Sequence, residues 1–571
     1  MTSSPLTSNP TNRTARRSLA RRGGAVGAGG VLVAGTAAAL LTAFAGQAGA
    51  ASTITVDSSG DGPADAARCT DITVGNCTLR DAALATSSGD TITFDAAIST
   101  ITLTNGSITL SAVNITGPGS SALTITTTGT GLYDLFSFRS SSGDVTVSGL
   151  SITKNRIKTS NQGTFTLNDV SISDCYSPYG GALYAVNTGD LVISGSHFEN
   201  NTAANTGGAV YANSSGDVTV SDSEFIDNAA IRNSGGGIYV SVNATSFTLT
   251  DSTVTGNTAL FGGGLSISAN GTVTIADSDI SSNTATSRGG GAYVNLGSND
   301  LATQVTVQRS TFDGNITGGD GGGLHVAGRY LLVENSTFSN NQARLGGGIS
   351  SSYGGQATIN NTTISGNQAS NGGGVYSAGT DVAMNQSTIS ENSGINVYND
   401  GDSGGVWVAN GALNISGTII SGNTADTAGQ EDVVMYGGGV FYSDHSIVGN
   451  VYGNTVTDLG GTIISTTPGL LALADNSGPT KTMALDPTSV AIDAGPDPVA
   501  TFTGNGFDQR GTPYLRVFNG TVDIGAFEVQ ATAPPTSSTT TTTTAPTTST
   551  TGVDPTTTTT EDDVMVPTFT G

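Results

Sequence analysis

Charged residues, histidine and cysteine are all scarce in this chain, and each scarcity excludes a class of site or partner. Only 11% of the 571 residues are charged, with 19 lysines and arginines against 44 acidic residues. This excess of negative charge repels phosphate backbones, so we exclude nucleic acid as a partner. The three histidines, His197, His325 and His445, lie too far apart in the sequence pattern to share a metal ion.

Cysteine is limited to three residues, so the chain can form at most one internal disulfide. Cys69 and Cys77 are close enough in sequence to close a small loop, and we predict that they pair in an oxidising exterior. Cys175 is then the odd one, and we interpret it as a small, buried, apolar residue.

Residues 1–50 have the composition of an export signal. Arginines precede the apolar run GAVGAGGVLVAGTAAALLTAFA, and Ala48-Gly49-Ala50 follows it as a cleavage site. We therefore expect cleavage near Ala50 and a secreted or cell-surface chain, with the export route left open. The alternative is an uncleaved membrane anchor, which we disfavour because glycine-rich segments insert poorly.

Two sequence markers recur together, roughly every 26 residues, through the middle of the chain. The first is a glycine pair followed by an aliphatic residue or alanine, as in GGAV at 207–210. The second is an apolar residue, two further residues and an asparagine, as in FIDN at 225–228. The asparagines of the second marker are Asn201, Asn228, Asn257, Asn283, Asn315, Asn341, Asn367, Asn392, Asn423 and Asn450.

Apolar and polar residues alternate just before each asparagine, as in VTVSDSEF at 218–225. A period of two residues predicts strands with one buried face, and two or three short strands fit in each unit. A unit this small cannot bury its apolar face alone, but stacked units can, with each strand parallel to its counterpart in the next coil. The absence of a 3.6-residue period excludes a helical repeat.

We therefore predict an all-β fold, a single-stranded right-handed parallel β-helix over residues 92–465. It should have about thirteen coils and a length of roughly 60 Å at about 4.8 Å per coil. The asparagines should stack at one corner, where asparagine tolerates left-handed backbone and its amide can bond to the next asparagine.

The glycine pair and the Phe-x-x-Asn marker together resemble the polymorphic outer-membrane-protein repeat over residues 180–450. The resemblance implies a right-handed parallel β-helix of the pectate-lyase-like class. Adhesins, autotransporter passengers and polysaccharide lyases share this solenoid, so the resemblance specifies the fold and leaves the function open.

Residues 51–91 are predicted to cap the first coil. Thr78 and Asp81 have the spacing of a capping box, and Leu79, Ala82 and Ala83 fall on one face of a short helix. The segment also resembles the Cys-Ser-Leu-Arg-Glu-Ala motif that precedes such β-helices, with Thr78 and Asp81 in place of serine and glutamate. This resemblance favours a structural role.

Residues 466–530 contain three segments unlike the repeat: LADNSGPTKTMALDPTSVAIDAG at 473–495, DQRGTPY at 508–514 and VDIGAFE at 522–528. Together they resemble the choice-of-anchor Q domain of exported bacterial proteins. The resemblance implies no activity, so we interpret the polar residues of this segment as structural. These residues are Asp493, Asp508, Arg510, Asp523 and Glu528. Residues 531–571 are rich in threonine and proline and are predicted to form a disordered stalk.

Acidic residues occupy one bend position on successive units, at Asp222, Asp251 and Asp277, and Arg309 follows them. Stacked carboxylates repel unless a cation screens them, so calcium is one alternative. Aspartate and asparagine are also ordinary corner residues, and we interpret this series as turn formers. Equivalent positions on other units hold Gly195, Asn335 and Asn361. We therefore predict no metal site and no cofactor.

In each unit, a residue at or near the second position after the glycine pair is expected to point outward. Read unit by unit, this position holds Tyr239, Ser266, Tyr293, His325, Ser350, Tyr376, Trp407 and Phe441. We predict that Tyr376, Trp407 and Phe441, on consecutive coils, form a ligand-binding strip on which sugar faces pack. The alternative is that the rings stack only to stabilise coil-to-coil packing.

The leading hypothesis for function is a non-enzymatic adhesin or glycan-binding surface protein, monomeric and without predicted catalytic residues. Its partner would be an extracellular polysaccharide or another component of the cell envelope. The alternative is a polysaccharide lyase or glycoside hydrolase that acts on acidic polysaccharide, and a pure scaffold is the third class.

Overall fold

The computed structural model describes residues 51–71, 75–128, 134–241, 243–296, 303–328, 330–395, 402–500, 502 and 504–530. The predicted export signal at 1–50 and the predicted stalk at 531–571 lie outside the described residues. Within the described part, no helix is long and apolar enough to cross a membrane.

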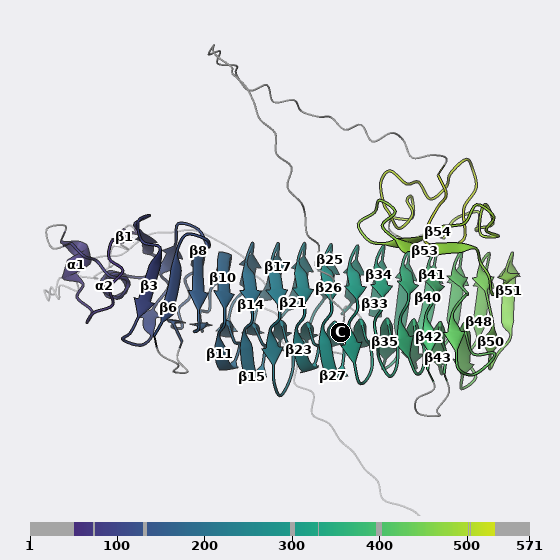
Figure 1. The fold of residues 1–571 in the computed structure, drawn as a ribbon, viewed down its shortest axis with the longest axis horizontal. Coiled ribbons are helices and arrows are strands. Elements are labelled where there is room, and N and C mark those ends of the chain that lie inside the picture. The colour runs from purple at the N-terminus through teal and green to yellow at the C-terminus, as the bar shows by residue number, and fades with distance from the viewer. Residues whose placement is uncertain are drawn as a thin grey trace, which may run out of the picture. The chain divides into compact units, whose positions relative to one another are not determined.

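A central coil contains four short strands, one more than the sequence predicted. Residues 191–214 form such a coil, with β13 (Leu191–Ser194), β14 (His197–Glu199), β15 (Thr202–Thr206) and β16 (Val210–Ser214). The next coil begins at β17 (Asp217–Ser221), which pairs in parallel with β13. Repetition of this arrangement stacks the coils along one axis, as Figure 1 shows.

We name the four sides of the coil the first, second, lateral and return faces. The first face contains β1 (Thr53–Val56), β2 (Thr91–Phe94), β5 (Asn114–Thr116), β13, β17, β21 (Ser246–Thr250), β25 (Val273–Ala276), β29 (Val305–Gln308), β33 (Tyr330–Glu334), β36 (Gln356–Asn360), β40 (Asp381–Asn385), β44 (Leu413–Ser416), β48 (Phe441–Asp444) and β51 (Val456–Gly460). The second face contains β3 (Thr100–Leu103), β6 (Thr124–Thr127), β14, β18 (Glu224–Ile226), β22 (Thr253–Thr255), β26 (Asp279–Ser281), β30 (Thr311–Asp313), β34 (Thr337–Ser339), β37 (Thr363–Ser365), β41 (Thr388–Ser390), β45 (Ile419–Ile420), β49 (Ile447–Val448) and β52 (Ile463–Ile464). Two long strands, β8 (Val145–Thr153) and β10 (Phe165–Ser173), run through both faces.

The lateral and return faces close each coil. The lateral face contains β11 (Tyr176–Tyr179), β15, β19 (Ala229–Ala230), β23 (Thr258–Phe261), β27 (Thr284–Arg288), β31 (Ile316–Thr317), β38 (Gln368–Ala369), β42 (Ser393–Gly394) and β46 (Thr424–Ala425). The return face contains β4 (Ile108–Leu110), β7 (Phe136–Phe138), β9 (Ile157–Thr159), β12 (Leu183–Thr188), β16, β20 (Ile238–Val240), β24 (Leu265–Ile267), β28 (Ala292–Asn295), β32 (Leu324–Ala327), β35 (Ile349–Ser352), β39 (Val375–Ala378), β43 (Val406–Ala409), β47 (Val433–Tyr436) and β50 (Val451–Tyr452).

The pairing pattern confirms the predicted fold class, because neighbouring strands on all four faces are parallel in the described residues. The return face is a 14-stranded sheet with one strand per coil, which agrees with the prediction of about thirteen coils. One detail differs from the prediction. The first strand is β1, which pairs with β2 although it lies inside the predicted cap segment.

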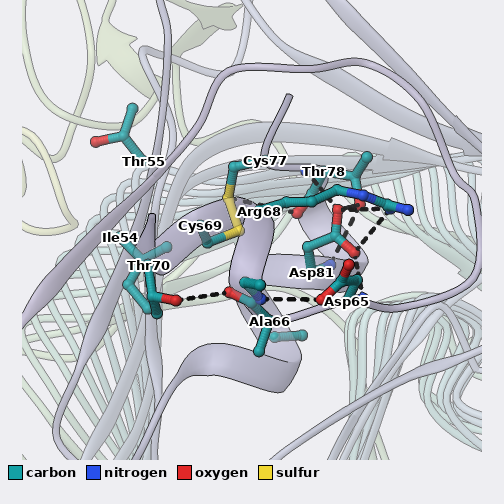
Figure 2. Close-up of a disulfide and its surroundings, with 12 residues drawn as sticks. Ile54, Thr55, Asp65, Ala66, Arg68, Cys69, Thr70, Cys77, Thr78 and Asp81 are labelled. Carbon is teal, nitrogen blue, oxygen red and sulfur yellow. Dashed lines mark hydrogen bonds and ion pairs between the residues drawn. A yellow bond between two sulfur atoms is a disulfide. The ribbon is translucent and has the colours of Figure 1, made fainter. Parts of the chain in front are cut away.

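The cap is inserted between β1 and β2 and consists of α1 (Ala67–Thr70) and α2 (Leu79–Ala85). Cys69 and Cys77 form a disulfide with an S–S distance of 1.92 Å that joins α1 to the residues before α2 (Figure 2). Thr78 and Asp81 form the expected capping box at the start of α2. The Arg68 guanidinium contacts the same Asp81 carboxylate at 3.3 Å, so one buried acid holds both helices.

A ladder of asparagines runs along the corner between the second and lateral faces. The side-chain oxygen of Asn228 accepts bonds from both the backbone N–H and the amide of Asn201, at 2.9 and 3.0 Å. The same pair of bonds repeats from coil to coil up to Asn423. The left-handed residue at this corner is the one before the asparagine, such as Asp227 with φ of 53°, and not the asparagine itself.

Both ends of the ladder depart from the sequence prediction. Asn450 is not a rung, because Asp432 accepts the bonds from Asn423, and Asn450 is exposed. At the other end Cys175 takes the position before Asn201, and its N–H donates to the Asn201 oxygen at 3.2 Å. Cys175 is buried and outside any disulfide, and burial raises the pKa of its thiol.

A second ladder, which the sequence analysis missed, runs along the corner between the first and second faces. On each coil the hydroxyl of a serine or threonine accepts the backbone N–H of its counterpart one coil earlier, as from Ser252 to Ser278 at 3.2 Å. The hydroxyl also donates to a carbonyl of its own coil, as from Ser278 to Ala276 at 2.7 Å. The sequence signal was present in the polar pair before each apolar marker.

Residues 466–530, which we call the C-terminal module, leave the solenoid after β52. The module contains one antiparallel pair, β53 (Leu470–Ala474) and β54 (Thr482–Leu485). Figure 1 shows this pair beside the C-terminal coils, close to β34 and β41. We call residues 475–481, which connect the two strands, the module turn.

Candidate functional site

Each strand of the second face has one outward residue at the same position in the register. This residue is open to solvent in the N-terminal coils and covered in the C-terminal coils. From the N-terminal to the C-terminal coils this outward register position holds His197, Glu224, Thr253, Asp279, Thr311, Thr337, Thr363, Thr388, Ile419 and Ile447. The first five of these residues are exposed or half-buried, whereas the last five have at most 1% exposure. The C-terminal module covers the last five.

Polar contacts fix the module to the covered coils. Gln509 inserts its side-chain amide between two threonines of the second face, donating to Thr337 Oγ1 at 3.0 Å and accepting from Thr363 Oγ1 at 2.6 Å. Arg516 reaches the solenoid corner, where its Nη2 donates to Asn361 Oδ1 at 2.8 Å. Gln509 and Arg516 are fully buried, so these bonds are shielded from water.

Apolar contacts continue the attachment toward the C-terminal end. Ile419 and Ile447 point outward from β45 and β49, yet both are fully buried against Leu485, Ala491 and Ile524 of the module. Sealing outward isoleucines in this way contributes roughly 2 kcal/mol for each side chain. The change from charged residues to threonine and then isoleucine along this register position was the sequence signal for the docking surface.

Within the module, the polar residues identified from the sequence form a packed network. Asp508 pairs with Arg510 at 2.6 Å, and Arg510 lies between the rings of Tyr514 and Phe527 at 3.8 Å from each centroid. Asp493 is exposed, and its backbone N–H donates to Asp523 Oδ1 at 2.8 Å. The arrangement explains these residues by packing and hydrogen bonding within the module.

Glu528 balances the charge of this network. Three buried acids, Asp508, Asp523 and Glu528, accompany two buried arginines, Arg510 and Arg516. Burial raises the pKa of Glu528 to about 8, and the charges of Asp523 and Asp508 add to this effect while Arg516 opposes it. A proton retained on Glu528 would leave the five groups without net charge, which lowers the cost of burying them.

A cleft opens at the boundary between the open and covered parts of the second face, with a volume of about 790 Å³. Its floor comes from three successive coils, with Thr253, Asp279 and Thr311 at the outward register position. The module turn forms one wall and contributes Asp475 and Lys481. We call this the module cleft. The sequence analysis did not identify it, because it depends on where the module docks.

One side of the module cleft is the corner series that the sequence analysis interpreted as turn formers. Asp251, Asp277 and Arg309 have φ of 49°, 51° and 46°, which are left-handed corner conformations. Arg309 forms a two-pronged contact with Asp277 at 2.6 and 2.5 Å, and this pair raises the pKa of the guanidinium. The arginine thereby screens the charge of Asp277, and the cleft keeps a net negative lining.

Two aspartates on adjacent coils, Asp279 and Asp313, face the cleft. Partial desolvation raises the pKa of Asp279, and the charge of Asp313 raises it further, although Asp279 is exposed on the molecular surface. A hydrogen bond from Ser281 and the charge of Lys481 oppose this rise. Asp313 accepts bonds from Ser339 Oγ at 2.6 Å and Asn340 Nδ2 at 2.8 Å.

The predicted aromatic strip of Tyr376, Trp407 and Phe441 is not assembled. Phe441 lies in β48 on the first face and points into the core, whereas Val434 of β47 occupies the position beside Trp407 on the return face. The extra glycines before Phe441 belong to a turn after β47 and misled the unit count. Trp407 is only 7% exposed and stacks with Tyr436, with centroids 6.0 Å apart.

Two further groups of aromatic residues on the return face form stacks. Tyr184, Tyr211 and Tyr239 lie on consecutive coils with ring centroids 5.2 Å apart, and Tyr293 stacks on His325 at 5.6 Å. Rings that stack on one another present their edges to solvent, so their faces are not available to sugars. Burial also lowers the pKa of His325 to about 3, which keeps it neutral. The prediction of a ligand-binding strip is therefore wrong, and the aromatic rings of the return face serve coil-to-coil packing.

Among the described residues, no group of three or more histidine, cysteine, aspartate or glutamate side chains is arranged to hold a metal ion. The three histidines are separated as expected. His197 contacts Glu224 and Glu199 on the open second face, His325 is buried on the return face, and His445 contacts Asp444 at a first-face corner.

Comparison with known proteins identifies one family, and solved structures resemble the chain. The right-handed β-helix region family matches residues 30–280, 140–320 and 264–477. Two mannuronan C-5 epimerase A-modules from Azotobacter vinelandii, AlgE6 and AlgE4, are 14% and 12% identical to the chain, with TM-scores of 0.33 and 0.31. In both cases the alignment covers 67% of this chain and 93% of the other. No curated protein matches the chain.

Proposed function

Because the chain belongs to the right-handed β-helix family, we propose that it is a secreted or cell-surface protein that binds an uncharged polysaccharide in the module cleft. The observation that carries this proposal is the cleft of about 790 Å³, lined by carboxylates, hydroxyls and an ammonium group from three coils and the module turn. Such groups donate and accept the hydrogen bonds that a polyhydroxylated chain offers.

The charges of the cleft select among polysaccharides. Its lining contains the carboxylates of Asp251, Asp277, Asp279, Asp313 and Asp475 against the cations of Arg309 and Lys481. A uronic acid chain would place further carboxylates among these and would be repelled. The proposed ligand is therefore a neutral glycan, which differs from the acidic substrate expected for an enzyme from the sequence alone.

The proposed location follows from the N-terminal sequence and the cap. The arginine-rich, apolar and Ala-x-Ala segments at 1–50 support export with cleavage near Ala50. The disulfide between Cys69 and Cys77 supports an oxidising compartment. The resemblances to the polymorphic outer-membrane-protein repeat and to the choice-of-anchor Q domain support display at the cell surface.

Retention on immobilised linear glucans, mannans and galactans tests the proposal. The informative variant is Asp279→Asn, which removes one acceptor charge from the cleft floor and should weaken retention about tenfold. Asp217→Asn is the matched control, because Asp217 is an exposed aspartate of the first face and lies outside the cleft lining. Equal retention of both variants and the parent, or retention only of acidic polysaccharides, would refute binding in this cleft.

A second candidate function, hydrolysis of the bound glycan, is favoured by the Asp279 and Asp313 pair. Asp279 is opposite Thr311 on the next coil, and Asp313 lies two residues further along the same strand. Strand geometry then separates their Cα atoms by about 8 Å. The carboxyl groups of inverting glycosidases are roughly 6.5–9.5 Å apart, which leaves room for a water molecule.

In this candidate reaction the two acids have different roles. Protonated Asp279 would donate its proton to the glycosidic oxygen as the C–O bond breaks. The Asp313 carboxylate would take a proton from the attacking water, whose oxygen bonds to the anomeric carbon with inversion. The raised pKa of Asp279 keeps it protonated at higher pH than an ordinary aspartic acid.

The measurement that separates hydrolysis from binding alone is the release of reducing ends from a retained glycan. Hydrolysis should be lost in both Asp279→Asn and Asp313→Asn, and it should persist in Asp217→Asn, which lies outside the cleft. It should fall as pH rises through the raised pKa of Asp279. Retention without any release of reducing ends leaves the protein a binder.

A further inference from the structure

We propose that the module cleft recognises the end of a glycan chain and does not accept an internal segment. This inference rests on the proposed binding of a neutral glycan in the cleft. It follows from the direction in which the cleft is open and from the position of its wall.

The open part of the second face determines the direction in which a bound glycan chain extends. The cleft floor is formed by β22, β26 and β30, which are three successive coils. Adjacent coils are about 4.8 Å apart, so a ligand that contacts all three extends along the stack. The same register position continues past the cleft through Glu224 and His197, both accessible, so a chain can leave the cleft in that direction.

In the opposite direction the second face is sealed one coil beyond the cleft. Thr337 follows Thr311 in register and is fully buried. Its hydroxyl donates to the carbonyl oxygen of Lys481 at 2.5 Å and accepts from Gln509 Nε2 at 3.0 Å. No glycan residue can lie over Thr337 while these bonds exist, so a chain along the second face must end at the module turn.

The wall is held rigidly enough to act as a stop. Thr480 of the module turn is buried and donates to the Asn335 carbonyl oxygen at 3.2 Å, and it also accepts from Gln509 Nε2 at 2.9 Å. Behind the turn, the module is sealed by Ile419, Ile447 and the buried Arg516. The terminal sugar would therefore meet Asp475 and Lys481, which project from a fixed turn into the cleft.

Titration with linear, uncharged glucans of short, intermediate and long mean length, together with graded mannans and galactans, tests this inference. A chain-end site saturates in proportion to the number of chains, so the binding capacity per gram of polymer should fall as the chains lengthen. A site for internal segments saturates in proportion to the number of sugar residues, and a constant capacity per gram would overturn the inference. Failure of every polymer to bind would instead refute the proposed function on which the inference rests.

Two variants locate the terminal sugar. Lys481→Ala changes the wall and should weaken the binding of the shortest oligosaccharide and of the long chain by the same factor, about five- to tenfold. Glu224→Ala changes the open side and should weaken only oligosaccharides long enough to extend beyond the cleft. The inference is overturned if Lys481→Ala affects long chains and leaves the shortest oligosaccharide unchanged.

Discussion

The open and covered parts of the second face share one backbone geometry and one interior, and they differ only in their outward side chains. Beneath both, the asparagine ladder repeats with bonds of 2.8–3.0 Å between side chains. Above them, Glu224 and Asp279 face solvent, whereas Thr363 and Ile419 face the module. The repeat therefore determines the solenoid, and the outward residues that depart from the repeat pattern determine where the module docks and where the cleft opens.

The largest difference between the two parts should appear when a charge is placed on the covered part of the second face. Ile419→Asp would bury a carboxylate against Leu485, Ala491 and Ile524 and should detach the module, at a cost of at least about 4 kcal/mol. Limited proteolysis of residues 466–530 and loss of glycan retention measure this effect. Thr253→Asp, at the same register position on the open part, is the control and should leave the module protected. Protection of the module in both variants would contradict the docking surface.

Variants in the solenoid interior should have a smaller effect on stability. This effect should be the same beneath the open part and beneath the covered part of the second face. Asn283 lies beneath the open part and Asn367 beneath the covered part, and each accepts two bonds from the preceding asparagine. Changing either to alanine leaves the backbone N–H of the preceding asparagine without its acceptor, removes the ladder bond between the two side chains, and should destabilise the solenoid by about 3 kcal/mol. Denaturant unfolding measures both.

Asn450→Ala serves as the control for these ladder variants. Asn450 is exposed and outside the ladder, so its change should cost less than about 0.5 kcal/mol. A cost at Asn450 equal to that at Asn283 would show that the ladder bonds do not stabilise the coils. A large difference between Asn283 and Asn367 would show that the module, and not the repeat, supports the interior.

The smallest expected effect is a pH dependence of module docking, which concerns only the covered part of the second face. The folded-state pKa of Glu528, about 8, lies above its ordinary value of 4.5, so proton uptake stabilises the docked module fully below the lower value. This stabilisation is lost as pH rises through about 8, and we expect a loss on the order of 1 kcal/mol between pH 7 and pH 8. Module protection against protease should therefore weaken with rising pH. Glu528→Gln should abolish this dependence, and an unchanged dependence in that variant would assign it to another group.

The sequence predicted the interior well and the exterior poorly, for a physical reason. Strand alternation and the corner asparagines act between neighbouring coils, so periodicity locates Asn283. Cys69 and Cys77 pair within a short loop, so their small separation in sequence was enough to predict the disulfide. The site depends on contacts such as that of Gln509 with Ser336, for which no local pattern exists. Asp279 was therefore missed, and Phe441 was assigned to the wrong face because an extra glycine turn shifted the unit count.

The wide difference in sequence separation between these two kinds of contact also sets an order of events during folding. Bonds between neighbouring rungs close loops of 25 to 32 residues, whereas the bond from Gln509 to Ser336 spans 173 residues. Short loops close first, and each finished coil is the template for the next, so winding proceeds locally while docking waits for the complete stack. The module cleft is thus the last part of the molecule to form, and a chain arrested before its final coils has a solenoid but no cleft.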